Sequence, residues 1–594
     1  MNGTNRNNMF LAIALSALVI FGWQYFVVTP QMKADQARQA VLAHQEKKQP
    51  QLGAPGAAPA NVPGMAGTTV HMSRDAALKA AGERVAIDSP LLDGSIALKG
   101  AKLDDLRLKK YRETTNPKSP EIVLLAPKST EYPYYAQFGW IGQNVPTDQT
   151  VWAQQGSGAL SPGHPVTLTW DNGQGLTFTR VIAVDAQYMF SINDKVANKS
   201  GQAQTLYPFA YVAREGVPKE QTSWVLHQGF VGVANGSETD ANYADFKEEG
   251  TPPKNFSSTG GWVGITDKYW MAAVVPPQGE TYNGAYLGST LTGDTKAYQA
   301  NYRLGARIIA DGAEAQVTHR LFAGAKVVDI LRGYEKSQGI ARFDNAVDWG
   351  WFWFLTQPLF WLLDIFSKFI GNFGIAILML TVVVKLLFFP LANASFKSMS
   401  RMKKVQPYME EIKKAHKEDP QRQQQEIMAL YKREKVNPLT GCLPMLIQIP
   451  VFFSLYKVLY VTIEMRQAPF YGWIHDLSAP DPTTILNLFG LLPYHIPAFV
   501  PAYLSIGIWP ILMGITQFVQ TKLNPAPTDP VQAKMFTFMP LIFTFMFATF
   551  PAGLVIYYTW NNLLSVSQQY FIMRREGVEV HLFENLKFGK TKAK

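Results

Sequence analysis

Cysteine is almost absent from the sequence, and the short motifs of common hydrolases and metalloenzymes are missing. Because Cys442 is the only cysteine, an intrachain disulfide is excluded. Neither His-Glu-x-x-His nor Gly-x-Ser-x-Gly occurs, and there is no paired Cys/His cluster, so the usual zinc-protease, α/β-hydrolase and zinc-finger patterns are excluded. Isolated histidines such as His164 and His227 are therefore interpreted as structural. The sequence predicts no catalytic residues, no metal site and no cofactor, and we do not expect an enzyme.

Charged residues are also scarce, at 17% of the chain, whereas hydrophobic residues make up 47%. Several apolar runs reach the length of about 20 residues that a helix needs to cross a bilayer. The chain has 594 residues, which is more than one hydrophobic core organises, so at least two domains are expected. These features predict an integral membrane protein with a soluble part.

The N-terminal half predicts an anchor, a linker and a β-domain. The apolar run within residues 1–28 ends in Trp23 and Tyr25, which favours an uncleaved transmembrane anchor over the alternative of a signal peptide. Residues 29–82 are rich in Ala, Gln, Pro and Gly, which is typical of a flexible linker. Residues 83–340 contain short alternating runs of apolar and polar residues between turn signals. That pattern predicts an antiparallel β-sandwich.

Two apolar segments follow, and the charge of the next loop decides between them. Residues 344–369 are crowded with aromatics, and residues 371–391 form an apolar run that contains Lys385. The loop 392–440 carries eleven Lys and Arg residues, and short basic loops stay in the cytoplasm. With the β-domain outside, only one span fits between that domain and the loop. We therefore expect residues 371–391 to span the membrane and residues 344–369 to form an amphipathic helix along its outer interface.

The basic loop predicts a cytoplasmic helical hairpin. Apolar residues recur at helical spacing on both sides of Asp419-Pro420, and Pro407 is expected to kink the first helix. Charge alone would also allow a nucleic-acid surface. However, acidic residues are interleaved and aromatics are few, which favours a solvated hairpin near anionic lipid. We expect no specific nucleic-acid partner.

The remaining chain predicts four more spans, which gives six spans with both termini in the cytoplasm. The expected segments are the spans 441–463, 502–521, 535–551 and 552–573, an outer loop 464–501, a cytoplasmic loop 522–534 and a basic cytoplasmic tail 574–594. The second half of the outer loop is apolar but broken by prolines, so it is interpreted as interfacial, with a re-entrant segment as the alternative. The fold class is thus a polytopic α-helical membrane protein with a five-helix core and a large outer β-domain.

Lys385 is the charge that most needs an explanation. A charge at the centre of a membrane helix costs about 2.5–3.5 kcal/mol on insertion scales. A lysine near a helix end can instead extend its ammonium to the headgroups, so position alone leaves both interpretations open. Other polar residues lie at the same depth, namely Thr381, Gln448, Gln517, Asn561, Asn562 and Gln568. Each alone is typical of helix–helix contact, but together they indicate a polar cavity within the bundle, which favours a function for Lys385.

Three long segments of the core resemble the YidC/Oxa/Alb family of membrane-protein insertases. They are YKREKVNPLTGCLPMLIQIPVFFSLYKVL (431–459), IEMRQAPFYGWIHDLSAPDP (463–482) and FTFMPLIFTFMFATFPAGLVIYYTWNNLLSVSQQ (536–569). The segment LFAGAKVVDIL (321–331) looks like the end of the family's periplasmic domain, and the order of parts is similar to that of the Gram-negative members. The resemblance covers nearly the whole chain.

The resemblance implies an insertase of the bacterial inner membrane, with a positively charged hydrophilic groove open to the cytoplasm and to lipid. The implied groove residues are Lys385, Thr381, Gln448, Gln517 and Tyr558, and the implied apolar slide for substrates consists of Ile449, Pro450, Phe452, Met546 and Phe547. Many relatives carry arginine at the position of Lys385. Lysine keeps the charge but lacks the planar fork of arginine, so an arginine-specific hydrogen-bond pattern is not expected.

The partners implied by the resemblance are nascent membrane proteins, the Sec translocon (SecYEG and SecDF) and membrane lipid, with the ribosome contacted through the basic tail. Three rival interpretations remain, which are a transporter, an exported sugar-binding β-domain on a membrane anchor, and a membrane enzyme. An internal repeat would favour the transporter, and none is visible. The enzyme would need a nucleophile–base pair, for which the sequence offers no candidate.

Overall fold

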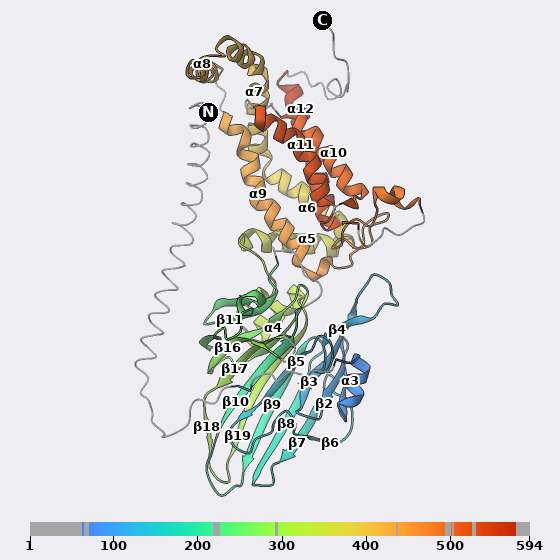
Figure 1. Cartoon of the computed structure of the whole chain (residues 1–594), viewed down its shortest axis with the longest axis vertical. Helices are drawn as coiled ribbons and strands as arrows, with labels where there is room; N and C mark the ends of the chain where they lie inside the picture. The colour runs from blue at the N-terminus through green and yellow to red at the C-terminus, as the bar shows by residue number, and fades with distance from the viewer. Residues whose placement is uncertain are drawn as a thin grey trace.

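A β-domain and a bundle of helices make up the computed structural model (Figure 1). The structure describes residues 62–63, 71–217, 226–291, 295–434, 438–492, 500–501, 504–524 and 530–577. The predicted anchor, most of the predicted linker and nearly all of the basic tail lie outside these residues. The β-domain occupies one end of the long axis and the helical hairpin around α8 the other, with the remaining helices between them (Figure 1).

The β-domain consists of two antiparallel sheets, as the alternating pattern predicts. The first has the order β1 (Arg84–Asp88), β2 (Leu92–Ala97), β3 (Lys102–Arg112), β5 (Tyr134–Ile141), β10 (Gln204–Glu215), β17 (Lys296–Leu304), β16 (Thr281–Thr290), β13 (Lys254–Thr259), with β4 (Glu121–Leu125) on β3 and β18 (Arg307–Ile309) on β10. The second has the order β12 (Ser237–Asn242), β11 (Gly229–Ala234), β14 (Gly261–Thr266), β15 (Trp270–Val275), β19 (Glu314–Ala325), β9 (Met189–Asn198), β8 (Leu176–Val184), β7 (Val166–Asp171), β6 (Ala153–Gln155). A short η2 turn (Tyr243–Phe246) follows β12.

β8 shows how the sequence builds this sandwich. Its residues alternate between buried and half-buried along the whole strand, because successive side chains of a strand point to opposite faces. Arg180 takes one of the buried positions. Its guanidinium bonds the carboxylate of Asp194 on β9 at 2.6 and 2.7 Å, and this pairing makes a buried charge tolerable.

One helix lies within the segment predicted as a flexible linker. α3 (Arg74–Ala80) begins after Ser73, whose side chain accepts a hydrogen bond from the backbone N–H of Ala76. Asp75 in the first turn and Lys79 in the last favour the helix through its dipole. The composition of the whole segment concealed these local helix signals.

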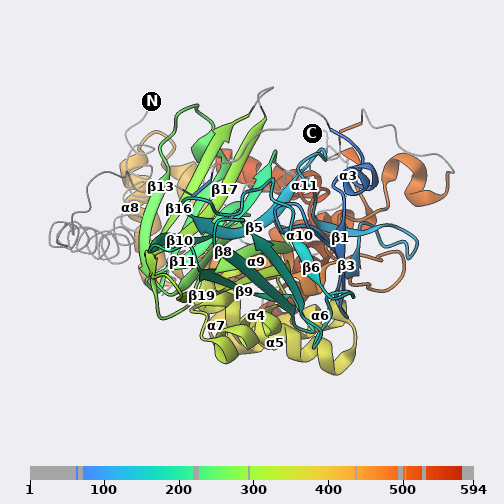
Figure 2. The ribbon, with the colours of Figure 1, turned by 90° about the horizontal axis from the view of Figure 1, so that it is seen from below.

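The helical part begins at the end of the β-domain. Its elements are α4 (Val328–Gln338), η3 (Phe343–Ala346), α5 (Trp353–Ile370), α6 (Phe373–Leu387), α7 (Phe389–Ala415), α8 (Pro420–Arg433), α9 (Pro438–Val461), η4 (Ile463–Met465), η5 (Ile485–Gly490), α10 (Ile508–Leu523), α11 (Pro530–Phe547) and α12 (Ala552–Arg575). α5 lies across the bundle at the end that faces the β-domain (Figure 1). Seen from below, the strands lie in front of α10 and α11 (Figure 2).

Two helix boundaries differ from the predicted spans for identifiable reasons. α6 ends at Leu387 because Pro390, in the first turn of α7, has no N–H for the preceding turn, and the chain bends there by 69°. α10 begins at Ile508 rather than at residue 502. The outer loop caps it there, since Asp481 accepts from the N–H of Trp509 at 2.9 Å and Thr483 from the N–H of Ile508 at 3.0 Å.

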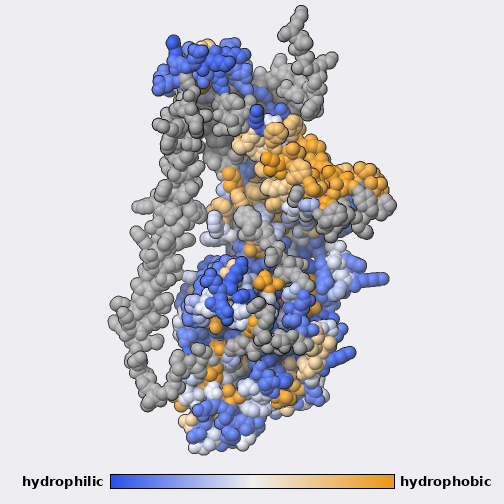
Figure 3. Space-filling model, in the orientation of Figure 1, coloured by the Kyte–Doolittle hydropathy of each residue, from blue (hydrophilic) through white to orange (hydrophobic). Residues whose placement is uncertain are grey.

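In the described part of the chain, no single helix combines the length and the apolar composition that crossing a bilayer requires, whereas α6 and α7 meet that requirement as a bent pair. The surface of the helical part is nonetheless strongly apolar between the hydrophilic hairpin and the β-domain (Figure 3). Exposed large apolar residues there include Leu386, Leu387, Phe538, Ile542 and Phe571.

Candidate functional site

Lys385 extends from α6 towards α12. Its Nζ donates a hydrogen bond to the hydroxyl of Ser565 at 2.6 Å, and that hydroxyl donates to the backbone oxygen of Asn561 at 2.8 Å. Ser565 is almost completely buried. The ammonium therefore lies among the helices, and its hydrogen bond to Ser565 directs the Lys385 side chain from α6 towards α12.

A small cavity of about 60 Å³ lies beside this lysine. Its lining comes from α6, α7, α9 and α12 and consists of Val384, Lys385, Phe388, Leu391, Ala392, Gln448, Val451, Tyr557 and Asn561. Because one water needs only about 10–15 Å³ of such space and two to four polar partners, this cavity has room for a few waters. Lys385 and Gln448, two of the predicted groove residues, thus line one cavity, together with Tyr557, Asn561 and several apolar side chains.

α12 supplies a polar stripe that the predicted residue set did not include. Tyr557, Asn561, Ser565 and Gln569 recur every four residues, which places them on one face of the helix, and each is at most 3% exposed. The spacing of four is a signal that the sequence alone offers. Asn561 was among the polar residues predicted at this depth but the other three were not, because single tyrosine, serine and glutamine residues are common in helices.

The other predicted groove residues lie elsewhere around this stripe. Thr381 is buried and donates to the backbone oxygen of Ile377 on its own helix at 2.7 Å. Gln517 on α10 accepts from the side-chain amide of Asn562 at 3.1 Å. Tyr558 packs against the rings of Phe452 and Phe547, with centroids 5.7 and 5.3 Å away. The predicted set is therefore divided among one cavity, one buried position on α6, one contact between α10 and α12, and one aromatic cluster.

The predicted slide residues are also divided between surface and interior. Ile449 and Met546 are 45% and 42% exposed, and Phe452 and Pro450 are half-buried. Phe547 is buried, where its ring stacks on that of Phe550 with centroids 5.0 Å apart. The aromatic cluster thus forms an apolar layer behind the exposed residues.

Several buried polar atoms in the helical part have no hydrogen-bond partner among the described residues. They include Asn561 Nδ2, Gln520 Oε1, Gln568 Nε2 and Gln569 Oε1. An unpaired amide in an apolar environment costs several kcal/mol, on the order of 2–7. Four such atoms on α10 and α12 therefore favour contact with water or with a polar part of a substrate.

The hairpin of α7 and α8 has its own small core and a link to α12. Val405, Met409 and Leu430 are buried against one another. Lys397 forms an ion pair with Glu576 at 3.2 Å, just beyond the end of α12. α7 runs through Pro407 as one helix.

The β-domain and the helices meet in a polar interface. Lys457 of α9 forms an ion pair with Asp348, and Lys268 lies 3.9 Å from the ring centre of Tyr460. Burial raises the pKa of Asp348, but the ammonium of Lys457 and the contacts with His227 together outweigh burial and leave that pKa below its usual value. Burial raises the pKa of Glu464, which accepts from the N–H of Val328, to about 7.

Among the described residues, no group of three His, Cys, Asp or Glu side chains could hold a metal ion. Comparison with known proteins gives two family matches. The family described as the YidC periplasmic domain matches residues 84–362, and the 60Kd inner membrane protein family matches residues 365–578.

Full-length relatives show the same pattern. A protein of Methylobacterium radiotolerans named membrane protein insertase YidC is 54% identical, over 98% of this chain and 97% of its own length. One of the same name from Methylorubrum extorquens is 51% identical over 98% of each chain. A crystal structure of an active YidC insertase covers 82% of this chain and 92% of its own, with 17% identity and a TM-score of 0.35.

Proposed function

This chain belongs to the YidC family of membrane protein insertases, and we propose that it inserts and folds nascent proteins in the bacterial inner membrane through a cationic, hydrophilic groove beside Lys385. The observation that carries this proposal is the hydrogen bond from Lys385 to Ser565. It holds a positive charge inside the helical part, next to a cavity that is also lined by Asn561, whose amide nitrogen has no partner among the described residues.

The groove lowers the barrier that a substrate's polar flank meets. A charged group at the bilayer centre costs about 2.5–3.5 kcal/mol on insertion scales. A wet site with a fixed positive charge solvates a polar or acidic flank part of the way across and attracts it by Coulomb interaction. In this proposal Lys385 supplies the charge, and Gln448, Tyr557, Asn561 and Ser565 supply the hydrogen bonds.

The apolar part of the substrate follows a different surface. Ile449 and Met546 present exposed apolar side chains, backed by the cluster of Phe452, Phe547 and Tyr558. A hydrophobic segment gains about 25 cal/mol for each Å² that leaves water, so its burial drives insertion without a nucleotide. The substrate leaves the groove along this face into lipid.

The remaining parts of the chain bind partners in this proposal. The α7–α8 hairpin captures substrates on the cytoplasmic side, and the basic tail contacts the ribosome. Six spans keep both termini in the cytoplasm, with α5 along the outer interface, where its exposed Trp361 and Phe369 meet lipid headgroups. The protein acts alone or beside the Sec translocon.

Reconstitution into liposomes with a small single-span substrate tests the proposal. We expect insertion by the full chain, a loss of about tenfold or more in rate for Lys385→Ala, and near-normal rates for Lys385→Arg, because a tenfold change corresponds to only ~1.4 kcal/mol in the barrier. Lys368→Ala is the matched control, since Lys368 is a lysine of an apolar helix that pairs with Asp329 and Asp364 outside the groove. Solute flux without insertion, or full activity of Lys385→Ala, would contradict the proposal.

A further inference from the structure

A cavity of about 620 Å³ lies on the β-domain beside the segment that follows α9. Its lining residues come from β4 and the loop after it, from residues 72–74 at the start of α3, and from a group that includes Tyr269, Trp270 and Arg466. Figure 1 places β4 at the end of the domain that faces the helices. This volume is within the range of about 300–1,000 Å³ that is typical of ligand-binding pockets.

The cavity runs along the edge of β4 and not over one of its faces. Ile122, Val123 and Leu124 all line it, although they are consecutive residues. Successive side chains of a strand point to opposite faces, so only a cavity at the strand's edge can contact all three. Val123 is 41% exposed there.

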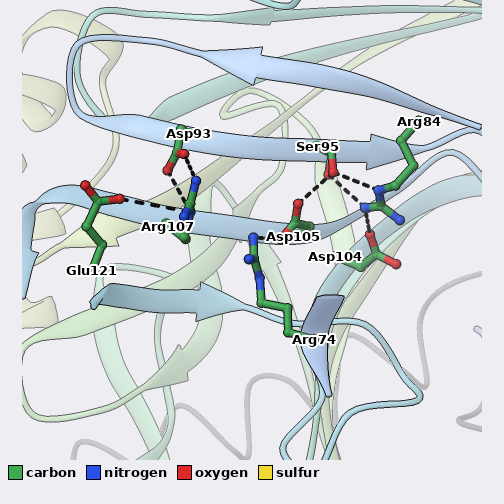
Figure 4. Close-up of polar contacts among 8 residues, drawn as sticks. All are labelled: Arg74, Arg84, Asp93, Ser95, Asp104, Asp105, Arg107 and Glu121. Atoms are coloured by element: carbon green, nitrogen blue, oxygen red, sulfur yellow. Dashed lines mark hydrogen bonds and ion pairs between the residues drawn. The ribbon is translucent and has the colours of Figure 1, made fainter. Parts of the chain in front are cut away.

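That edge of β4 is open in the described part of the chain. β4 pairs with β3 along its other side, and the next backbone contact is the bridge between Ala126 and Tyr134 just beyond its end. A strand paired on one side directs alternate N–H and C=O groups to the open side, where they need partners. Glu121 of β4 lies near Arg107 of β3, and β3 is in turn linked to α3 by the Arg74–Asp105 ion pair (Figure 4).

A second part of the lining combines aromatic rings with arginines and a paired carboxylate. The guanidinium of Arg466 lies 5.1 Å from the ring centre of Trp270 and donates to the backbone oxygen of Arg112 at 2.6 Å. Arg214 bonds both carboxylate oxygens of Asp267 at 2.7 Å. Since Arg466 follows η4 directly after α9, this part of the lining lies where the chain leaves the helical part. The cavity therefore borders the segment that follows α9, at the junction of the two parts.

We propose that this cavity binds an extended stretch of polypeptide, which adds to β4 as a further antiparallel strand. Only an extended backbone offers donors and acceptors at the repeat that a strand edge presents, and this is the usual mode of peptide binding at a free edge. The occupant is the outer segment of a substrate that has just crossed the membrane, with apolar or aromatic side chains against Val123 and Trp270. This inference rests on the proposed insertase function.

Cross-linking from two exposed edge positions tests the inference. A photo-reactive phenylalanine analogue replaces Val123 in the full chain, reconstituted in liposomes with a single-span substrate that has an outer tail. The control carries the analogue at Ile308, which is 77% exposed on the short edge strand β18, at the end of the domain away from the helices. We expect the outer tail to cross-link at position 123 and not at position 308. Cross-links to lipid alone, equal yields at both positions, or none at position 123 while insertion proceeds would overturn the inference and leave the proposed function standing.

A direct measurement of peptide binding tests the inference without requiring insertion activity. The probe is a synthetic peptide with the sequence of that outer tail, titrated into the full chain in detergent. A lysine at an edge disfavours strand addition, so we expect Val123→Lys to weaken binding by about tenfold or more and Ile308→Lys to leave it within about twofold. Equal affinities for the two variants, or no binding by the unaltered chain, would contradict the inference. If insertion itself fails while the peptide binds, the proposed function fails and the binding site remains.

Discussion

Arg180 and Asp194 show how one pair of residues decides the stability of the β-domain. Both side chains are about 2% exposed, and the guanidinium also donates to the backbone oxygen of Ala101 at 3.3 Å. Removing one member leaves the other charged and buried. We expect Arg180→Ala to lower the free energy of unfolding of the domain by about 3–5 kcal/mol. Chemical denaturation of the full chain in detergent measures it. Lys195→Ala is the control, because Lys195 forms an exposed pair with Glu314, and its loss is expected to cost less than about 1 kcal/mol.

Glu464 makes the junction of the two parts sensitive to pH. Its usual pKa of 4.5 rises to about 7 on burial, so the folded chain holds a proton that the unfolded chain has lost. The folded state is therefore favoured fully below about pH 4.5 and loses that contribution as pH rises to about 7, on the order of 3 kcal/mol. We expect the Tm in detergent to fall between pH 5 and pH 8, and Glu464→Gln to flatten this fall. An unchanged pH profile in the Gln variant would contradict the prediction.

At the scale of single elements, two serines of α12 can be compared. Ser565 lies on the face that also carries Tyr557, Asn561 and Gln569, and Ser567 lies outside it. Ser565 accepts from Lys385, whereas Ser567, two residues along, is exposed and bonds only its own helix at Leu563. Both serines make the same backbone contact, so helix effects cancel between them. We expect Ser565→Ala to reduce insertion several-fold, since the ammonium loses its fixed position, and Ser567→Ala to leave it unchanged. Equal rates for the two variants in the liposome assay would show that Lys385 needs no partner on α12.

Element type was more predictable from the sequence than element ends. The alternation in β8 and the helical spacing of Val405, Met409 and Ile412 report directly on burial, so the antiparallel sheets and the hairpin helices could be predicted. The start of α10 could not, because its cap comes from Asp481 in a loop far back in the chain. Local patterns contain no information about such partners.

The candidate site has the same limit, because its contacts join residues that are distant in the sequence. A lysine in an apolar run is visible in any sequence, and Lys385 was predicted for that reason. Its partner Ser565 lies 180 residues later, and only packing of α6 on α12 brings the two together. The resemblance implies Tyr558 as a groove residue, and this stays a prediction. The structure shows Tyr557 beside the cavity and Tyr558 in the aromatic cluster, because adjacent residues of a helix point about 100° apart.

At the scale of the whole molecule, the contacts between the β-domain and the helices determine whether the two move together. Asp348 lies just after the β-domain and pairs with Lys457, which is 12% exposed, on the outer half of α9. Asp348 also accepts from the backbone N–H of His227 at 3.2 Å, so one carboxylate links β-domain, connector and core. If the proposed peptide site on β4 is to receive a segment from the groove, this linkage must hold the two sites in register.

A double-mutant cycle measures that linkage. Asp348→Asn and Lys457→Gln each remove one charge at nearly constant size, and we expect their combined effect to be smaller than the sum of the single effects by about 1–3 kcal/mol. The readout is hydrogen exchange at residues 226–234 and 340–350 in the reconstituted full chain. The Asp329–Lys368 pair gives the control cycle, because its members are 66% and 61% exposed and screened by water, so its coupling is expected below about 1 kcal/mol. Additive effects at Asp348 and Lys457 would mean that the ion pair does not couple the two parts, and that the β-domain is held by its other contacts with α9 and η4.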